Sequence, residues 1–208
     1  NLLNSNKREI NCGMAGTAFR FLTAFFAQSN REVILTGSSR MKERPIAELV
    51  KTLQEMGADI EYLEKENYPP LLIKGKSLQA GKLNLSANVS SQFVTAIMLI
   101  APMLDAPTEI ILSNKIVSKP YIEMTAKVMQ HFGADVTILN NTIKILPSPY
   151  KEQTLLIEGD WSSAAFYYSL VALSEKGAIE LNPLSNDSWQ GDQVAEAIFY
   201  RLGVKTSH

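Results

Sequence analysis

Apolar residues recur at helical and at strand spacing along the whole chain, and they predict an alternation of the two. From Pro45 to Met56 the apolar positions lie three or four residues apart, which is the period of one helix face. Similar stretches predict helices at 17–28, 91–104, 120–132, 162–174 and 191–202. Short apolar runs predict strands at 31–36, 59–63, 70–74, 108–113, 134–139, 142–146, 154–158 and 177–181, and residues 37–42 are predicted to form a turn.

One pattern within this alternation is repeated. The sequence Gly-Ala-Asp-Ile at 57–60 returns as Gly-Ala-Asp-Val at 133–136, and a degraded copy follows at 203–205. Phe21, Phe93 and Phe166 fall at matching places in the helices upstream of these copies. A fixed period indicates one supersecondary unit used repeatedly, with neighbours burying each other's apolar faces. Equivalent loops of such units can gather on one face and form a site jointly.

The predicted elements of one repeat run strand, helix, strand, helix, strand, strand. This order predicts an α/β (α+β) fold built of repeated βαβαββ units, with mixed sheets and helices. Pro147-Ser148-Pro149 is interpreted as a linker between the second and third copies. The chain opens on the end of a strand, at 9–13, and stops just after Gly203, a helix-ending glycine. We therefore expect it to be a fragment of a longer protein.

Composition narrows the class of protein. The 208 residues are 46% hydrophobic and 20% charged, which is ordinary for a globular protein with a core. A net charge of −1 argues against nucleic acid as the main partner, because no basic stripe is available to bind phosphates. One cysteine, Cys12, excludes a disulfide framework and favours a cytoplasmic location. The longest apolar run, 93–104, is too short to span a membrane.

Two segments before predicted helices have the residues of an anion site. Residues 13–20 form a small-residue loop that leads into a helix, where glycine allows close approach and free N–H groups favour an anion. Tight helix packing explains the same small residues. Residues 40–45 place Arg40, Lys42 and Arg44 in one turn, and arginine suits carboxylate or phosphate. A solvated surface turn explains these equally well, although Glu43 could hold one of the cations in place.

Hydroxyl groups gather at two later helix starts. Ser90, Ser91 and Gln92 begin the helix at 91–104. One serine is explained by capping, whereas two serines with a glutamine exceed what a cap requires and make a bound phosphate credible. Ser118 and Tyr121 begin the helix at 120–132, and Tyr121 either packs in the core or points its hydroxyl into a cleft.

The other polar candidates have simpler interpretations. Asp160 is interpreted as the N-cap of the helix at 162–174, and Cys12 as a small buried hydrophobe. His131 and His208 stand by themselves, and no group of His, Cys and Asp has metal-ligand spacing, so no metal site is predicted.

Together these segments resemble the enolpyruvyl transferases, and within them the branch that makes 5-enolpyruvylshikimate 3-phosphate. The resemblance rests on five segments in family order along the whole chain: 15–18 with Arg20, 35–37 with 40–46, 90–93, 118–122 and 158–160. It implies two domains, each of three βαβαββ copies. By that comparison residues 1–152 form most of the first domain, about two units, and residues 153–208 begin the second with a partial third unit.

The resemblance also implies a reaction. Such enzymes add the 5-hydroxyl of shikimate 3-phosphate to C2 of phosphoenolpyruvate and then release phosphate, without a metal or organic cofactor. By motif, phosphoenolpyruvate would be bound by Gly16, Arg40 and Gln92, and shikimate 3-phosphate by Ser90, Ser91, Gln92, Ser118 and Tyr121. The expected partners are these two small molecules, with no nucleic acid and no membrane, and the parent is expected to be a cytoplasmic monomer.

Two departures from the family pattern limit these expectations. Met14 stands where the family has Asn, so a polar contact near phosphoenolpyruvate is absent or replaced. The family's early Lys-Ser pair, its catalytic Asp and the later Lys and Arg residues are missing. No catalytic residue is therefore expected within residues 1–208, and the fragment is predicted to be inactive by itself.

Two other functions stay open from the sequence. The first is the sister transferase that acts on UDP-N-acetylglucosamine, which shares the fold but carries a reactive Cys in a long loop, unlike Cys12. The second is a non-catalytic module that binds a phosphorylated metabolite or a protein.

Overall fold

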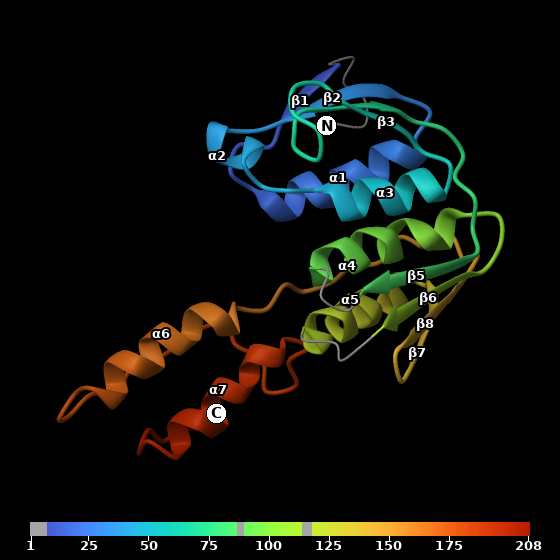
Figure 1. Ribbon diagram of the computed structural model, residues 1–208. Coiled ribbons are helices and arrows are strands. Elements are labelled where there is room, and N and C mark those ends of the chain that lie inside the picture. Colours follow the sequence, from blue (N-terminus) through green and yellow to red (C-terminus); the bar gives the residue numbers. More distant parts are fainter. Residues whose placement is uncertain (1–7, 87–89, 114–117) are drawn as a thin grey trace.

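The computed structural model describes residues 8–86, 90–113 and 118–208 (Figure 1). The first unit follows the predicted order and adds a short helix, α2, within the predicted turn at 37–42. Ser38 caps α2 by accepting a hydrogen bond from the Met41 N–H at 3.3 Å, which supports one helical turn there. The unit consists of β1 (Glu9–Asn11), α1 (Gly16–Gln28), β2 (Glu32–Thr36), α2 (Ser39–Lys42), α3 (Ala47–Glu55), β3 (Asp59–Tyr62) and β4 (Leu71–Lys74).

The second unit repeats this order without a counterpart of α2 among the residues that the structure describes. The helix predicted at 91–104 ends at Ile100 and continues as a 3-10 turn, because Pro102 has no N–H for a further α-helical hydrogen bond. The elements are β5 (Lys82–Ser86), α4 (Ser91–Ile100), η2 (Ala101–Met103), β6 (Thr108–Ser113), α5 (Lys119–His131), β7 (Asp135–Leu139) and β8 (Thr142–Leu146).

The two units build sheets of the same topology. The strand order is β1-β2-β4-β3 in one sheet and β5-β6-β8-β7 in the other. The first pair of each sheet is parallel, since a helix connects its strands, and the remaining pairs are antiparallel. The predicted βαβαββ unit with a mixed sheet is thereby confirmed twice.

The repeated Gly-Ala-Asp sequence is a repeated helix ending. Gly57, Gly133 and Gly203 have φ angles of +97°, +89° and +91°, which a side chain disfavours. After each glycine the next N–H reaches back five residues, as from Ala58 to the Leu53 carbonyl at 2.8 Å. These bonds form the Schellman motif, so the same device ends α3, α5 and α7.

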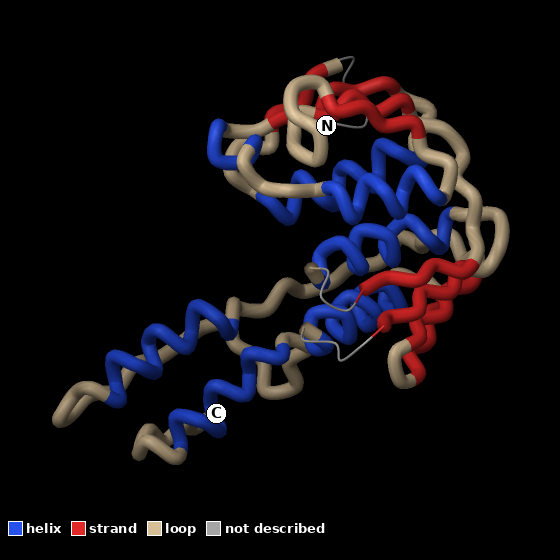
Figure 2. Tube along the Cα trace, in the orientation of Figure 1, coloured by secondary structure: helices blue, strands red, loops and turns tan. Residues whose placement is uncertain are grey.

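The helices of the two units share one core. Figure 2 shows α1, α3 and α4 between the strands of the first sheet, at the top, and those of the second, at the lower right. α1 packs against α4, and α4 packs against α5. One buried cluster therefore contains side chains from both units, among them Phe26, Leu35, Leu53, Ile97 and Ile110.

The rest of the chain, residues 147–208, is called the third region here, and it differs from the prediction. The strands predicted at 154–158 and 177–181 fall on described residues, and neither range is a strand. A strand needs a neighbouring strand for its N–H and C=O groups, whereas a helix bonds its own. The helices do form, as α6 (Trp161–Ala172) and α7 (Val194–Tyr200), the latter preceded by the 3-10 turn η3 (Gly191–Gln193) in place of a full helix over 191–202.

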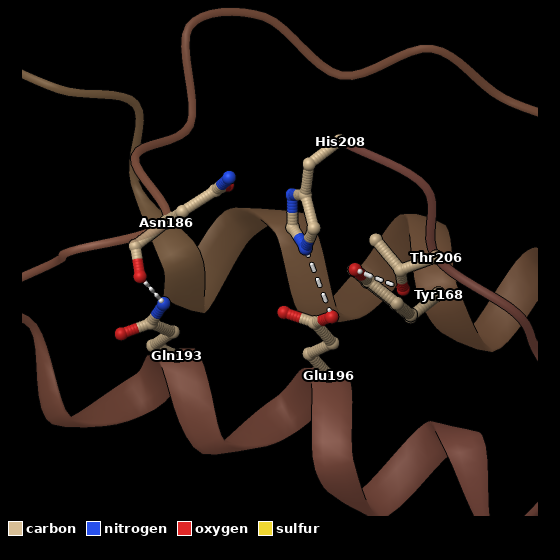
Figure 3. Close-up of polar contacts among 6 residues, drawn as sticks. All are labelled: Tyr168, Asn186, Gln193, Glu196, Thr206 and His208. Carbon is tan, nitrogen blue, oxygen red and sulfur yellow. Dashed lines mark hydrogen bonds and ion pairs between the residues drawn. The ribbon is translucent and has the colours of Figure 1, made fainter.

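In Figure 1, α6 and α7 lie side by side and extend away from the two units. The C-terminal segment runs back along these helices and is held by polar contacts (Figure 3). His208 Nε2 lies 3.0 Å from the Glu196 carboxylate, and the Tyr168 and Thr206 hydroxyls lie 2.9 Å apart. Around Trp161 this region has a small buried cluster of its own.

Candidate active site at the helix starts

Three helices begin on the same side of the molecule. In Figure 1 the N-terminal ends of α1, α4 and α5 all lie at the left, where α2 also lies. This follows from the repeat, because β1 and β5 each run parallel to the next strand and feed a helix at the same end of their sheet. The free N–H groups at these helix ends therefore lie on one side of the molecule.

The loop between β1 and α1 brings α2 beside the start of α1. Gly13 has a φ angle of +57°, and its N–H donates to Asn11 Oδ1 at 2.8 Å. Its carbonyl accepts a hydrogen bond from the Ser38 N–H at 2.9 Å. The segment that precedes α2 is thus held against the turn that opens α1.

Gly16, the first residue of α1, lies against a guanidinium group. A Cβ placed on Gly16 would come within 2.2 Å of Nη1 of Arg44 and within 2.7 Å of its Cζ. The absence of a side chain at this buried glycine is therefore what allows Arg44 to approach the helix start. The small residue thus serves close packing here, and the group that packs against it is a cation, so anion binding at this helix start stays a prediction.

Gln92, in the first turn of α4, joins the start of α4 to α1. Its Nε2 donates to Thr17 Oγ1 at 2.8 Å, and its Oε1 accepts a hydrogen bond from Nη1 of Arg20. The Arg20 guanidinium also lies over the Phe93 ring, 5.2 Å from its centroid. These contacts place side chains from both units in one polar network at the helix starts.

The network carries two cations. Partial burial lowers the pKa of Arg20, and the positive charge of Arg44 lowers it further. Within the described ranges, neither arginine forms an ion pair with a carboxylate. Two partly buried cations of like charge repel each other, so an anion between them would be stabilised.

Arg40, the arginine that the family resemblance assigns to phosphoenolpyruvate, differs from Arg20 and Arg44 because it is paired with a carboxylate. Its Nη1 lies 2.6 Å from the Glu43 carboxylate, and the Arg40 side chain is 77% exposed. Glu43 therefore holds one cation of the turn, as the sequence suggested, and that cation is Arg40.

The serines at the helix starts are available to other groups. Ser90 and Ser118 occupy the N-cap positions of α4 and α5, and Ala15 occupies that of α1. Among the described residues, no side chain makes a capping hydrogen bond at any of the three. We call these three the open helix starts. The N-cap of α6 differs, since the Asp160 carboxylate accepts a hydrogen bond from the Ser162 N–H at 3.0 Å and so confirms the predicted cap.

Tyr121 faces the third region. Its hydroxyl donates to the Asp192 carboxylate at 3.2 Å, and the Ser162 hydroxyl donates to the same oxygen. The negative charge of Asp192 raises the pKa of Tyr121, and partial burial adds to this effect. These residues line a cavity of about 620 Å³ whose apolar wall includes Met124 and Trp189. Of the two interpretations of Tyr121, a hydroxyl that points into a cleft is the one observed.

The remaining candidates have structural roles. Cys12 packs against the core, and burial raises the pKa of its thiol. His131 Nε2 lies 3.0 Å from the Thr154 carbonyl, beside Trp189. In the part of the chain that the structure describes, no three His, Cys, Asp or Glu side chains are grouped as a metal site would require. None of the helices formed by the described residues has the length and apolar character of a membrane span.

Sequence reasoning missed Arg44, Thr17 and Asp192 as members of the site. In the sequence, Arg44 is one of three equivalent cations, and Thr17 is part of the small-residue loop at 13–20. A signal existed for Arg20 and Arg44, because both belong to the segments that carry the family resemblance. Nothing in the sequence indicates that Asp192 reaches Tyr121, since 71 residues separate them.

Comparisons with known proteins identify relatives of this chain. A 3-phosphoshikimate 1-carboxyvinyltransferase from Bacteroides fragilis is 42% identical over 195 residues, which cover 93% of this chain and 48% of the relative. One from Haemophilus influenzae is 40% identical over 204 residues, covering 93% and 46%. The chain thus spans about half the length of the curated relatives it matches.

A solved structure shows the same fold. The EPSP synthase of Acinetobacter baumannii matches with a TM-score of 0.69 at 24% identity, over 80% of this chain and 37% of that chain. The family model for EPSP synthase (3-phosphoshikimate 1-carboxyvinyltransferase) matches residues 1–208. Because this match extends over the whole length of the chain, the chain belongs to the EPSP synthase family.

Proposed function

We propose that this chain provides one side of an active site that transfers the enolpyruvyl group of phosphoenolpyruvate to the 5-hydroxyl of shikimate 3-phosphate. The names of its relatives support this transferase activity. The structural observation that carries the proposal is the Arg44 guanidinium against Gly16, beside the open helix starts. Both proposed substrates are anions, and anions are bound by several convergent hydrogen-bond donors at helix N-termini and by arginine side chains.

The proposed roles follow the sequence assignment and extend it. Phosphoenolpyruvate is bound by Gly16, Arg40 and Gln92, and Arg44 is added because it lies against Gly16. Shikimate 3-phosphate is bound by the hydroxyls and the amide at the second and third open helix starts: Ser90, Ser91, Gln92, Ser118 and Tyr121. The lack of a side-chain cap among the described residues at α4 and α5 supports this, because Ser90 and Ser118 are not engaged in capping.

The chemistry of this half-site is positioning and charge stabilisation. Donors that converge on two phosphate groups hold the 5-hydroxyl near C2 of phosphoenolpyruvate, which removes much of the entropic barrier of a two-substrate reaction. Cations near the departing phosphate stabilise the charge that develops as it leaves the tetrahedral intermediate. Proton transfer is assigned to residues outside this chain, so we expect no measurable transferase activity from residues 1–208. Phosphate release at a rate typical of intact synthases would contradict that expectation.

The division into domains stays part of the proposal. Residues 1–152 are assigned to the first domain and residues 153–208 to the start of the second. The other two functions considered from the sequence, the UDP-N-acetylglucosamine transferase and the non-catalytic module, are not favoured by the family match.

A titration tests the proposed function. We expect the 208-residue protein to bind shikimate 3-phosphate weakly and to bind unphosphorylated shikimate at least about tenfold more weakly, since hydrogen bonds to a charged group contribute roughly 1.5–3 kcal/mol each. Replacing Ser90 and Ser91 together by Ala should abolish this preference with little change in the free energy of unfolding. Calorimetry with each ligand measures the first effect, and urea denaturation measures the second.

Asp160→Ala is the matched control, because it removes a side chain that does cap a helix, α6. It should lower stability and leave the preference for the phosphorylated ligand intact. Equal affinity of the unmodified protein for both shikimates would overturn the proposal. An unchanged preference in the double serine variant would remove these serines from the binding site.

A further inference from the structure

The amide of Gln92 is held from two sides by groups of the other unit. Arg20 has donors and no acceptor, so only the carbonyl oxygen Oε1 of Gln92 can face it. Thr17 Oγ1 then accepts from Nε2 at 2.8 Å. Thr17 and Arg20 lie three residues apart on α1, so they share one helix face. The hydrogen bonds with Arg20 and Thr17 therefore fix which end of the Gln92 amide is the oxygen and which is the nitrogen.

Arg20 is itself held in place. Its guanidinium lies over the Phe93 ring, next in sequence to Gln92, at 5.2 Å from the ring centroid. Its side chain is partly buried between α1 and α4, and it forms no ion pair with any residue of the described ranges. A carboxylate partner would draw the guanidinium away, whereas the ring and the amide oxygen keep it at the start of α4.

We propose that Arg20 is a positioning residue that fixes the orientation of the Gln92 amide and so turns the second N–H of Nε2 toward the bound anion. The identity of that anion, shikimate 3-phosphate or phosphoenolpyruvate, rests on the function proposed above. An amide that rotated by half a turn would direct its oxygen lone pairs at a phosphate and repel it. Arg20 prevents this, because its guanidinium accepts no hydrogen bond and stays protonated at any working pH.

The first test needs no ligand. In a proton–nitrogen NMR spectrum, the two side-chain amide protons of Gln92 should give widely separated signals. These signals are assigned because they disappear in Gln92→Leu. Arg20→Met should move these signals to the positions of a solvent-exposed glutamine, and Arg20→Lys, which keeps a donor, should restore them in part. The control is Arg201→Met, which removes the exposed arginine at the C-cap of α7 and should leave the Gln92 signals in place. Unmoved Gln92 signals in folded Arg20→Met protein would overturn the proposal.

The second test separates positioning from direct binding. The affinity for shikimate 3-phosphate is measured by calorimetry for Arg20→Met, Gln92→Leu and the double variant. We expect Arg20→Met to weaken binding about tenfold in the original protein and to have little further effect once Gln92 is replaced, since residues that act through one another are not additive. Fully additive losses would mean that Arg20 acts on the ligand independently and would refute the positioning role.

The two tests keep the inference distinct from the proposed function. If the unmodified protein does not bind shikimate 3-phosphate, the proposed function fails, while the NMR measurement still decides whether Arg20 orients Gln92. If Arg20→Met does not fold, as judged by thermal unfolding, Arg20→Lys and Thr17→Val decide the same question. Thr17→Val removes the acceptor of Nε2, and it should shift only the proton signal that faces Thr17.

Discussion

The two complete units and the third region contain helices at matching places, yet the units bury far more of their apolar residues than the third region does. Phe93 on α4 is 8% exposed, whereas Phe166, at the matching place on α6, is 76% exposed. In the units a four-stranded sheet covers one side of the helices, and the facing unit covers the other. In the third region, Leu156 and Ile157 lie in a predicted strand and remain 91% and 75% exposed.

This contrast shows which local patterns are sufficient and which need a partner. A helix satisfies its backbone groups internally, so α6 and α7 form although much of their apolar surface is uncovered. A strand satisfies them only with a neighbour, so residues 154–158 and 177–181 stay without strand structure. The difference in burial should also affect the stability of variants and the rate of hydrogen exchange. It should further affect the contacts that join the third region to the two units.

The largest expected effect is a difference in stability between two Leu→Ala variants, one in the shared core and one on α6. Leu53→Ala on α3 removes a fully buried side chain from the shared core and should lower the free energy of unfolding by about 2–5 kcal/mol. Leu170→Ala on α6, where the side chain is 57% exposed, should change it by less than about 0.5 kcal/mol. Urea denaturation of both variants measures the difference. Similar losses would show that the surface of α6 is covered in solution.

Hydrogen exchange should separate the same two parts. Backbone N–H groups in the middle of α1 and α4 open only when the shared core opens, so their exchange should be at least about a hundredfold slower than in α6 and α7. Mass spectrometry of peptides from each helix gives the rates. Equal protection of α4 and α6 would contradict the division into a stable pair of units and a weakly held third region.

Gly16→Ala tests the contact between α1 and Arg44. The new Cβ would overlap the guanidinium, and because this group ends a flexible side chain it should move aside at a cost of less than about 1 kcal/mol in stability. Phosphoenolpyruvate binding should weaken about tenfold, as expected for the loss of one hydrogen bond to a charged group.

The control for Gly16→Ala is Gly177→Ala in the third region, where a Cβ would meet the Ser174 side chain at an ordinary distance of 3.4 Å. That variant should leave phosphoenolpyruvate binding unchanged. Titration calorimetry provides both affinities. Unweakened binding in Gly16→Ala would exclude Arg44 from the anion site.

Tyr150 connects the linker to the second unit and gives a test by pH. Its hydroxyl donates to the Leu99 carbonyl at 3.0 Å, and partial burial raises its pKa to about 12 from an ordinary value near 10. The stability contributed by the neutral phenol is present below pH 10 and is lost as the pH rises to about 12. Denaturation at several pH values should show this loss relative to Tyr150→Phe. Parallel pH profiles of the two proteins would refute it.

The smallest effect concerns the contact between Tyr121 and the third region. Asp192→Asn removes the negative charge that mainly raises the pKa of Tyr121, so the phenol should ionise at a lower pH. The ultraviolet difference between each protein and its Tyr121→Phe version isolates this titration. An unchanged midpoint would show that the third region does not hold Asp192 against α5 in solution.

Local sequence was sufficient for features that depend on one stretch of chain. The period of apolar residues predicted α1, α4, α5 and α6 to within a few residues, because each helix makes its own hydrogen bonds. The repeated glycines at 57, 133 and 203 marked three equivalent positions, and each lies at a helix end, since a positive φ favours glycine whatever surrounds it. Asp160 was recognisable as a cap because its partner is two residues away.

Tertiary structure decided everything that joins distant segments. The choice between capping and an open helix start at Ser90 depends on where a hydroxyl points, and the selection of Arg44 beside Gly16 depends on how α2 folds against α1. The network from Thr17 to Gln92 spans 75 residues and exists because two units pack their helices together. The sequence determined the repeating unit and the family. The packing of one unit on another determined which of its polar residues meet, because contacts between distant segments are set by the assembled fold.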